Sequence, residues 1–245
     1  MTDFTGLVAV VTGGASGIGA AVAEELNRRG AQVAIIDRAP GTANDFPVEV
    51  ADITSDAEVR AAIAKIGARF GAIDVLVNNA GIGAAGDVAA NDDDEWHRVW
   101  DVNVVGIVRV TRAALPWLEK SDAAAVVNTA SVAATNGLPQ RALYSATKGA
   151  VLSLTYAMAA DHLAAGIRVN AVAPGTADTP WVQRLLAAAD DPAATAENLR
   201  RRQPLGRLVR ADEVAFAVAH LASPLAGSTT GTVLTVDGGL TTLRV

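Results

Sequence analysis

Apolar residues occur in two alternating patterns along this chain of 245 residues. Short runs in which nearly every residue is apolar are typical of strands that helices cover on both faces. Longer stretches repeat their apolar residues every three or four positions, as helices do. The runs that predict strands are 7–12, 31–37, 47–52, 73–81, 124–131, 167–175 and 232–239, and those that predict helices are 17–30, 55–71, 93–119, 141–165 and 211–222. This alternation predicts an α/β fold in which one domain, residues 1–245, forms a doubly wound parallel sheet with helices on both faces.

Residues 176–210 break this alternation. They contain Pro180, Pro192 and Pro204 together with many polar residues. A structureless loop of this length is uncommon inside a compact domain. We therefore expect the segment to be partly helical and to cover the substrate site.

The composition is that of a folded protein, with 51% hydrophobic and 19% charged residues. The net charge is −6 and no cluster of lysine and arginine interrupts it, which disfavours nucleic acid and anionic membranes as partners. No apolar run approaches the roughly 18 to 20 residues that span a bilayer. We expect no membrane association.

Cysteine is absent, which excludes disulfides and thiolate ligands and fits a reducing cytoplasm. The N-terminal "MTDFTGLVAVVTGG" lacks the basic start of a signal peptide, so we expect a cytoplasmic protein. His97, His162 and His220 are far apart and have no metal-ligand spacing, so we expect no metal site.

The stretch "TGGASGIG" (12–19) follows the first predicted strand and opens the first helix. Gly13, Gly17 and Gly19 allow a tight turn, and the helix N-terminus offers free N–H groups to a pyrophosphate. The spacing G-x-x-x-G-x-G differs from the general dinucleotide fingerprint G-x-G-x-x-G. The alternative is that these glycines only permit close packing of the helix on the strand.

Asp37 ends the second predicted strand, about 20 residues beyond the glycines. A carboxylate there can bind both ribose hydroxyls of NAD and would repel the 2′-phosphate of NADP. Arg38 follows directly and could hold such a phosphate, so NADP stays open. Asp37 could also be a simple turn residue.

Tyr144 and Lys148 are four residues apart in a predicted helix and therefore share a face. An ammonium near a phenol lowers the pKa of the phenol and suits it to moving an alcohol proton. Ser131, at the end of a strand, could bind the same substrate oxygen, and Asn103 could hold a water that returns protons to Lys148. The alternative for Tyr144 and Lys148 alone is a surface pair on a helix.

These motifs, in this order and over nearly the whole chain, resemble the short-chain dehydrogenase/reductase family. Besides "TGGASGIG", the motifs that match are "NNAG" (78–81), "PGTADT" (174–179) and "DGG" (237–239). "PGTADTPWVQRLL" followed by "RRQPLGRLV" is similar to sugar-acid dehydrogenases of the 2-keto-3-deoxy-fuconate kind and to type-2 hydroxybutyrate dehydrogenases.

The resemblance implies a Rossmann-type fold, a homotetramer, and an NAD-dependent oxidoreductase that interconverts a secondary alcohol and a ketone. Tyr144 would transfer the proton, Lys148 would lower its pKa and bind the nicotinamide ribose, and Ser131 and Asn103 would complete the catalytic set. The expected cofactor contacts are Gly13, Ser16, Gly17, Ile18, Gly19, Asp37, Asp52, Ile53, Asn79, Ala80, Gly81, Tyr144, Lys148, Pro174, Gly175, Thr176 and Thr179. The alternatives are an NADPH-dependent reductase of ketoacyl type and a non-catalytic NAD-binding sensor or scaffold.

The substrate is expected to be a small carboxylate, either a hydroxy acid or a sugar acid. Arg141, one helical turn before Tyr144, and Arg184 and Arg202, in the segment 176–210, could bind its carboxylate. Trp181 could supply an apolar wall. The alternative is that the three arginines are solvated and pair with the acidic residues at 190–191.

Overall fold

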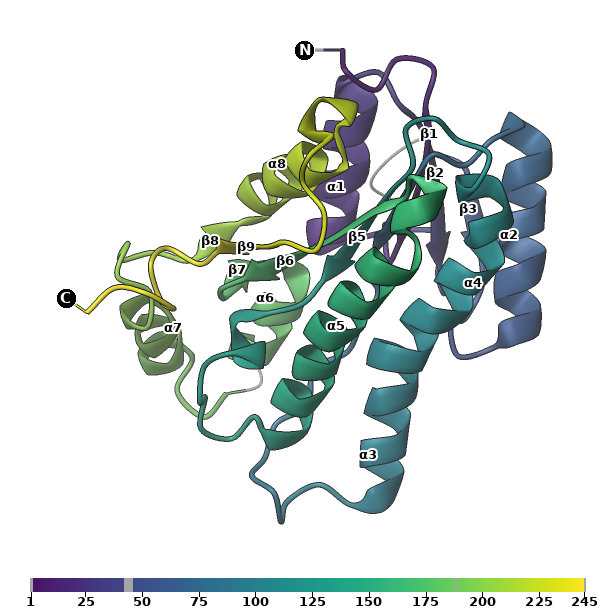
Figure 1. Cartoon of the computed structure of the whole chain (residues 1–245). Helices are drawn as coiled ribbons and strands as arrows, with labels where there is room; N and C mark the ends of the chain where they lie inside the picture. Colours follow the sequence, from purple (N-terminus) through teal and green to yellow (C-terminus); the bar gives the residue numbers. More distant parts are fainter. Residues whose placement is uncertain (1, 42–45, 188, 245) are drawn as a thin grey trace.

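The computed structural model describes residues 2–41, 46–187 and 189–244. Its core is a parallel sheet of seven strands in the order β3-β2-β1-β4-β5-β6-β9 (Figure 1). The strands are β1 (Val8–Thr12), β2 (Gln32–Asp37), β3 (Val48–Val50), β4 (Val75–Asn78), β5 (Ala125–Thr129), β6 (Arg168–Pro174) and β9 (Val233–Val236). The order reverses between β1 and β4, and a ligand crevice is expected at such a switch point, beyond the carboxyl ends of the strands.

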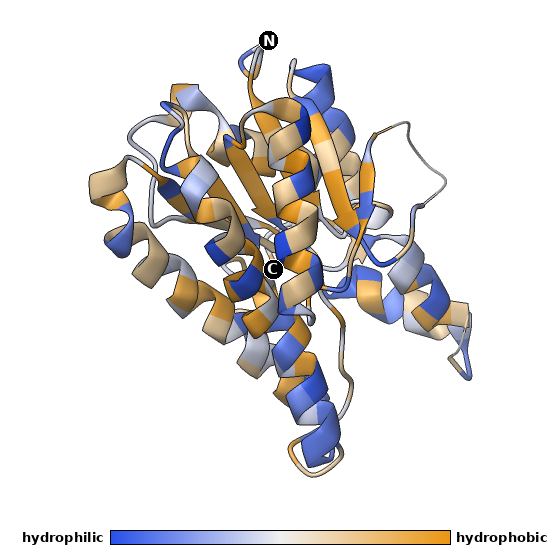
Figure 2. Cartoon of the chain, turned by 90° about the vertical axis from the view of Figure 1, so that its right-hand side faces the viewer, coloured by the Kyte–Doolittle hydropathy of each residue, from blue (hydrophilic) through white to orange (hydrophobic). Residues whose placement is uncertain are grey.

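Helices cover both faces of this sheet, which confirms the predicted fold class. On one face α1 (Gly17–Arg28) and α8 (Ala211–Ala222) pack against each other and against the strands. On the other face lie α2 (Asp56–Phe70), α4 (Gly106–Leu118) and α5 (Ala142–Asp161). Figure 2 shows strands that are mostly hydrophobic beside helices in which hydrophobic and hydrophilic residues alternate.

Buried amides fix α5 relative to the strands. Asn78 and Asn128 are register partners in β4 and β5, and the Asn78 amide donates to Oδ1 of Asn128 at 2.9 Å. Asn128 in turn donates to Oγ1 of Thr155 in α5 at 3.0 Å. Because all three side chains are buried, these hydrogen bonds hold α5 at a defined position beside the end of β5.

The predicted helix 93–119 is helical throughout but is not one regular α-helix. It consists of α3 (Asp93–Trp100), a π-helical turn (Asp101–Val105) and α4. In the π-helical turn the N–H of Gly106 bonds the carbonyl of Asp101, five residues back. The turn holds Asn103, and its extra residue changes which helix face that side chain occupies.

Residues 176–210 are partly helical, as expected. Between the short paired strands β7 (Ala177–Asp178) and β8 (Val209–Arg210) lie α6 (Pro180–Ala187) and α7 (Pro192–Arg201). Pro180 and Pro192 each occupy the first position of a helix, where a missing N–H is tolerated. The segment starts where β6 ends, so it lies at the carboxyl edge of the sheet (Figure 1).

None of the helices in the described ranges is long and apolar enough to cross a membrane.

Candidate active site

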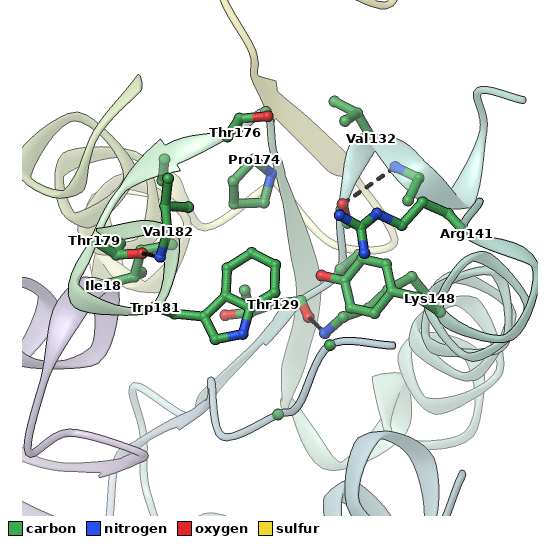
Figure 3. A pocket seen from close by; sticks show the side chains of 18 of the residues that line it. Ile18, Thr129, Val132, Arg141, Lys148, Pro174, Thr176, Thr179, Trp181 and Val182 are labelled. Atoms are coloured by element: carbon green, nitrogen blue, oxygen red, sulfur yellow. Dashed lines mark hydrogen bonds between the residues drawn. The ribbon is translucent and has the colours of Figure 1, made fainter. Parts of the chain in front are cut away.

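A cavity of about 240 Å³ lies at the carboxyl edge of the sheet, between α5 and residues 176–210 (Figure 3). Its lining comes from the ends of β4, β5 and β6 and from the helices α1, α5, α6 and α7. The residues that line it are Ile18, Asn79, Gly81, Ile82, Gly83, Thr129, Ala130, Ser131, Val132, Ala133, Leu138, Arg141, Tyr144, Lys148, Pro174, Gly175, Thr176, Ala177, Thr179, Trp181, Val182, Leu185, Leu199 and Arg202.

Lys148 is buried beside Tyr144. Both side chains project from the first two turns of α5, and Nζ of Lys148 lies 5.7 Å from the centroid of the Tyr144 ring. The ammonium donates to the carbonyl of Thr129, at the end of β5, at 2.8 Å. Burial lowers the pKa of Lys148 to about 8.

The phenol of Tyr144 does not have the lowered pKa that the sequence suggested. Burial raises the pKa of Tyr144 and outweighs the hydrogen bond with Ser131 and the charge of Arg141, which both lower it. The hydrogen bond from Lys148 goes to the Thr129 carbonyl, and Lys148 is not among the groups that lower the pKa of Tyr144. In this structure the phenol is therefore held in its protonated form.

Ser131 lies two residues after the end of β5, where it precedes the short 3-10 helix Val132–Ala134, and it has an extended backbone, with φ −170° and ψ 157°. Its Oγ accepts the N–H of Ala133 at 3.1 Å and interacts with Tyr144. Capping this short helix fixes the Ser131 hydroxyl next to the phenol, so that both can address one substrate oxygen.

Asn103 is fully buried and joins the loop after β4 to α5. Its Oδ1 accepts the N–H of Ile82 at 2.8 Å, while Nδ2 donates to the Ile82 carbonyl at 2.9 Å and to Oγ1 of Thr147 at 3.1 Å. Both amide hydrogens are thus used by protein acceptors. The water relay predicted for Asn103 is restricted to the remaining lone pair of Oδ1 or to its backbone carbonyl.

The glycine-rich turn is tightly packed, and its shape depends on glycine. Gly13 has φ +65°, and a Cβ there would lie 2.9 Å from Cα of Ala80. A Cβ on Gly19 would clash with the carbonyl of Gly13. The Asn79 amide donates to the carbonyls of Thr12 and Gly13 at 3.1 and 3.2 Å. The turn therefore presents its backbone at the N-terminus of α1, where Ser16 leaves the helix without a side-chain cap.

Asp37 lies at the end of β2, next to this turn. Its carboxylate accepts the N–H of Ala15 at 3.1 Å and of Ala39 at 3.3 Å, so it also anchors the glycine-rich turn. Arg38 is exposed and lies 3.9 Å from Asp52. Burial acts to raise the pKa of Asp52, but hydrogen bonds from Thr54 and nearby arginines lower it overall. The N–H groups at the start of α1 have no side-chain cap and can bind a pyrophosphate. The Asp37 carboxylate beside them can bind a ribose, so this part of the structure fits a nicotinamide dinucleotide.

The predicted cofactor residues fall into two groups. Ile18, Asn79, Gly81, Tyr144, Lys148, Pro174, Gly175, Thr176 and Thr179 line the cavity. Gly13, Ser16, Gly17, Gly19, Asp37, Asp52, Ile53 and Ala80 do not, and lie on or beside the glycine-rich turn and the ends of β2 and β3. Ile53 is buried against Gly106, so only its backbone is available to a ligand.

Two of the three predicted substrate arginines reach the cavity. Arg141 and Arg202 line it, whereas Arg184 is exposed on α6 outside the lining, which corrects that expectation. Arg184 begins the last turn of α6 and projects to solvent there. The alternative pairing with residues 190–191 is not seen in the described part of the chain, and Asp191 instead caps α7 through the N–H of Ala194 at 2.9 Å.

Trp181, predicted as an apolar wall, lines the cavity from α6 and faces Lys148 and Arg141 across it (Figure 3). Its indole packs against Gly83, where a Cβ would lie 2.6 Å from Cζ2.

Several lining groups were not found from the sequence. The Thr129 carbonyl that binds Lys148 is a backbone group, which sequence patterns cannot single out. Leu138, Leu185 and Leu199 gave no signal distinct from ordinary core leucines. Within the described residues there is no cluster of three or more histidine, cysteine or acidic side chains that could hold a metal ion.

In comparisons with known proteins, this chain is similar to reductases and dehydrogenases. A family model described as enoyl-(acyl carrier protein) reductase matches residues 13–241. The cis-4-hydroxycyclohexanecarboxylate dehydrogenase of Sinomonas cyclohexanicum is 42% identical over 97% of this chain and 98% of its own. The 2-(S)-hydroxypropyl-CoM dehydrogenase 3 of Xanthobacter autotrophicus is 39% identical over 96% and 97%. The solved structure of Thermoplasma acidophilum aldohexose dehydrogenase is 34% identical over 99% and 97%, with a TM-score of 0.94.

Proposed function

The chain belongs to the short-chain dehydrogenase/reductase family, and we propose that it uses NAD to interconvert a secondary alcohol and a ketone, with Tyr144 as the proton-transfer group. Membership makes the chain an oxidoreductase that acts on alcohol groups with a nicotinamide cofactor. The observation that carries the finer proposal is the grouping of Tyr144, Ser131 and Lys148 in one cavity that the residues next to the glycine-rich turn also line.

The side chains have separate tasks in this chemistry. A bound nicotinamide accepts or supplies the hydride. Ser131 and Tyr144 hydrogen-bond the substrate oxygen, and Tyr144 Oη takes the hydroxyl proton during oxidation and returns it during reduction. Lys148, charged below a pKa of about 8 and held by the Thr129 carbonyl, would bind the nicotinamide ribose beside the Tyr144 ring. Asn103 positions the loop at Gly81 and Ile82 against α5.

The preference for NAD rests on Asp37. Its carboxylate, at the end of β2 beside the glycine-rich turn, would accept hydrogen bonds from the adenosine ribose hydroxyls and would repel a 2′-phosphate. Arg38, the residue that would hold such a phosphate, is mostly exposed and directed toward Asp52.

The substrate proposal is a hydroxy acid or a sugar acid. The name of the Sinomonas relative includes a hydroxylated carboxylate, and that of the Thermoplasma relative includes a sugar. The motif similarity and the two arginines at the cavity support an acid in either case.

Turnover of a panel of hydroxy acids, sugar acids and neutral secondary alcohols with NAD⁺ and with NADP⁺ tests the proposal. We expect reduction of NAD⁺ by at least one secondary alcohol, and a loss of about 10²- to 10⁴-fold in kcat for Tyr144→Phe. NAD binding by calorimetry should be preserved in that variant, because the ring still packs. A Tyr144→Phe enzyme with more than half of the wild-type kcat would show that another group moves the proton.

A further inference from the structure

The cavity wall is divided by chemistry. Its hydroxyl and amide side chains belong to Tyr144 and Ser131, to Asn79, Thr176 and Thr179 among the expected cofactor contacts, and to Thr129. The part of the wall contributed by the loop after β4, the loop before α5 and the helices α6 and α7 carries no such group. It presents Ile82, Leu138, Trp181, Val182, Leu185 and Leu199.

Arg141 and Arg202 are the two cations set into this apolar part. Arg141 is held by a hydrogen bond from Nη1 to the carbonyl of Ala84 at 2.9 Å. Arg202 directly follows α7 and lines the cavity from the end of that helix, whereas Arg141 lines it from the start of α5. Burial lowers the pKa of Arg141, Tyr144 acts to raise it, and the charge of Arg202 lowers it further, so the two guanidinium groups that line this cavity lie within electrostatic reach. Among the described residues, neither forms an ion pair with a carboxylate.

Two like charges facing one cavity repel each other unless an anion lies between them. Elsewhere in the described residues, pairs of arginines share an acidic partner, as Arg28 and Arg29 share Glu25. Arg207 and Arg210, for example, both contact Glu213. Arg141 and Arg202 have no such partner from the described chain, so the missing anion is expected to come from the ligand.

We propose that the substrate is a hydroxy acid with an apolar body, whose carboxylate is bound between Arg141 and Arg202 while its alcohol carbon faces Tyr144. This inference rests on the proposed function and decides between its two substrate classes. A sugar acid has the same charge but would place several hydroxyls against the leucines, Ile82 and Val182, whose side chains cannot hydrogen-bond, and the single indole N–H of Trp181 could serve only one of them. Unpaired polar groups in such a wall select against the ligand.

A homologous series of secondary alcohols tests this directly. The acids 4-hydroxypentanoate, 5-hydroxyhexanoate and 6-hydroxyheptanoate vary the span from alcohol to carboxylate. Their methyl esters remove the charge, and gluconate keeps the charge but adds hydroxyls. The measured quantity is kcat/KM with NAD⁺ for wild type, Arg202→Gln and Arg202→Lys. Arg184→Gln is the matched control, because Arg184 is an exposed arginine of the same segment outside the cavity.

We expect one acid of the series to exceed its ester and gluconate by about 10- to 150-fold, the worth of a charged hydrogen bond. Arg202→Gln should remove most of this acid-to-ester ratio, Arg202→Lys should retain part of it, and Arg184→Gln should leave it as in wild type. A ratio near one in wild type, equal effects of Arg202→Gln and Arg184→Gln, or gluconate as the best substrate would overturn the inference while the dehydrogenase activity stands. Absence of turnover with every alcohol would overturn the proposed function itself, and the inference with it.

Discussion

At the scale of single residues, burial acts on Tyr144 and Lys148 in opposite directions. It raises the pKa of the phenol and lowers the pKa of the ammonium, so both shifts favour the neutral forms. The groups that oppose this for Tyr144 are Ser131 and Arg141. The spacing of Tyr144 and Lys148 in the sequence predicted that the two side chains lie together, and both line the cavity. It could not predict the direction of the shift, because desolvation depends on how the whole cavity closes around the phenol.

The first prediction concerns the pH dependence of alcohol oxidation. Oxidation needs Tyr144 deprotonated, so kcat/KM should rise as pH increases through the pKa of the phenol. Ser131→Ala removes a hydrogen bond that lowers this pKa, so the rising limb should move to higher pH. Ser153→Ala, at an exposed serine on α5, the helix that carries Tyr144, is the control and should leave the limb in place. A Ser131→Ala limb that coincides with wild type, or moves to lower pH, would contradict the assignment.

The second prediction concerns cofactor choice. Because Asp37 also accepts the N–H of Ala15, Asp37→Ala removes both its charge and its support of the glycine-rich turn. Asp37→Asn keeps an acceptor for Ala15 and removes only the charge. We expect Asp37→Asn to lower the ratio of kcat/KM with NAD to kcat/KM with NADP, mainly by raising kcat/KM with NADP. We expect Asp37→Ala to lower kcat/KM with both cofactors. Equal use of NAD and NADP by the wild type would show that Asp37 does not select the cofactor.

At the scale of helices and strands, the alternating apolar pattern was sufficient for the sheet and the covering helices. It was less accurate at the strand ends. The predicted strands 73–81 and 124–131 leave the sheet after Asn78 and Thr129, and the residues beyond them form the cavity wall. Most of these residues are apolar or small, as the residues of the strands are. Only their hydrogen bonding therefore distinguishes them from strand residues. The π-helical turn at Asn103 was not visible in the sequence either, because it contains no glycine or proline to mark it.

The third prediction tests how α6 is placed over the cavity. A Cβ on Gly83 would lie 2.6 Å from the Trp181 indole, so Gly83→Ala should push Trp181 and α6 outward. Overpacking of this kind costs on the order of 1–3 kcal/mol, and we expect it as a higher KM for the alcohol. In a Trp181→Ala background, Gly83→Ala should change KM little further, because the indole that the added methyl would meet is absent.

Gly137→Ala is the control for this double-mutant cycle, since a Cβ there meets nothing within 4 Å. If Gly83→Ala raises KM equally in both backgrounds, its effect does not pass through Trp181. The position of α6 would then depend on other contacts.

At the scale of the whole molecule, the outward face of α5 is unlike that of a solvated helix. The residues exposed along it are Ala146, Ser153, Tyr156, Ala157, Ala160 and, at its end, Asp161. The only charged residues of this helix are Lys148, which is buried, and Asp161, its last residue. A surface helix normally carries charged residues on its outer face, so this face is suited to contact with protein. Within the described ranges the edge strand β9 pairs with β6 alone and offers a second surface for contact.

The last prediction is that the protein is a homotetramer. Two different self-complementary surfaces, one on α5 and one at β9, assemble four copies with closed two-fold symmetry. Light scattering during size exclusion should give about four times the mass of one chain. Tyr156→Glu places a charge on the α5 face, where the tyrosine is 49% exposed, and should reduce the assembly to dimers held through β9. Val88→Glu, at a residue 76% exposed in a loop after β4, is the matched control and should leave the tetramer intact. A wild-type mass of one chain at micromolar concentration would mean that the bare face of α5 is solvated after all.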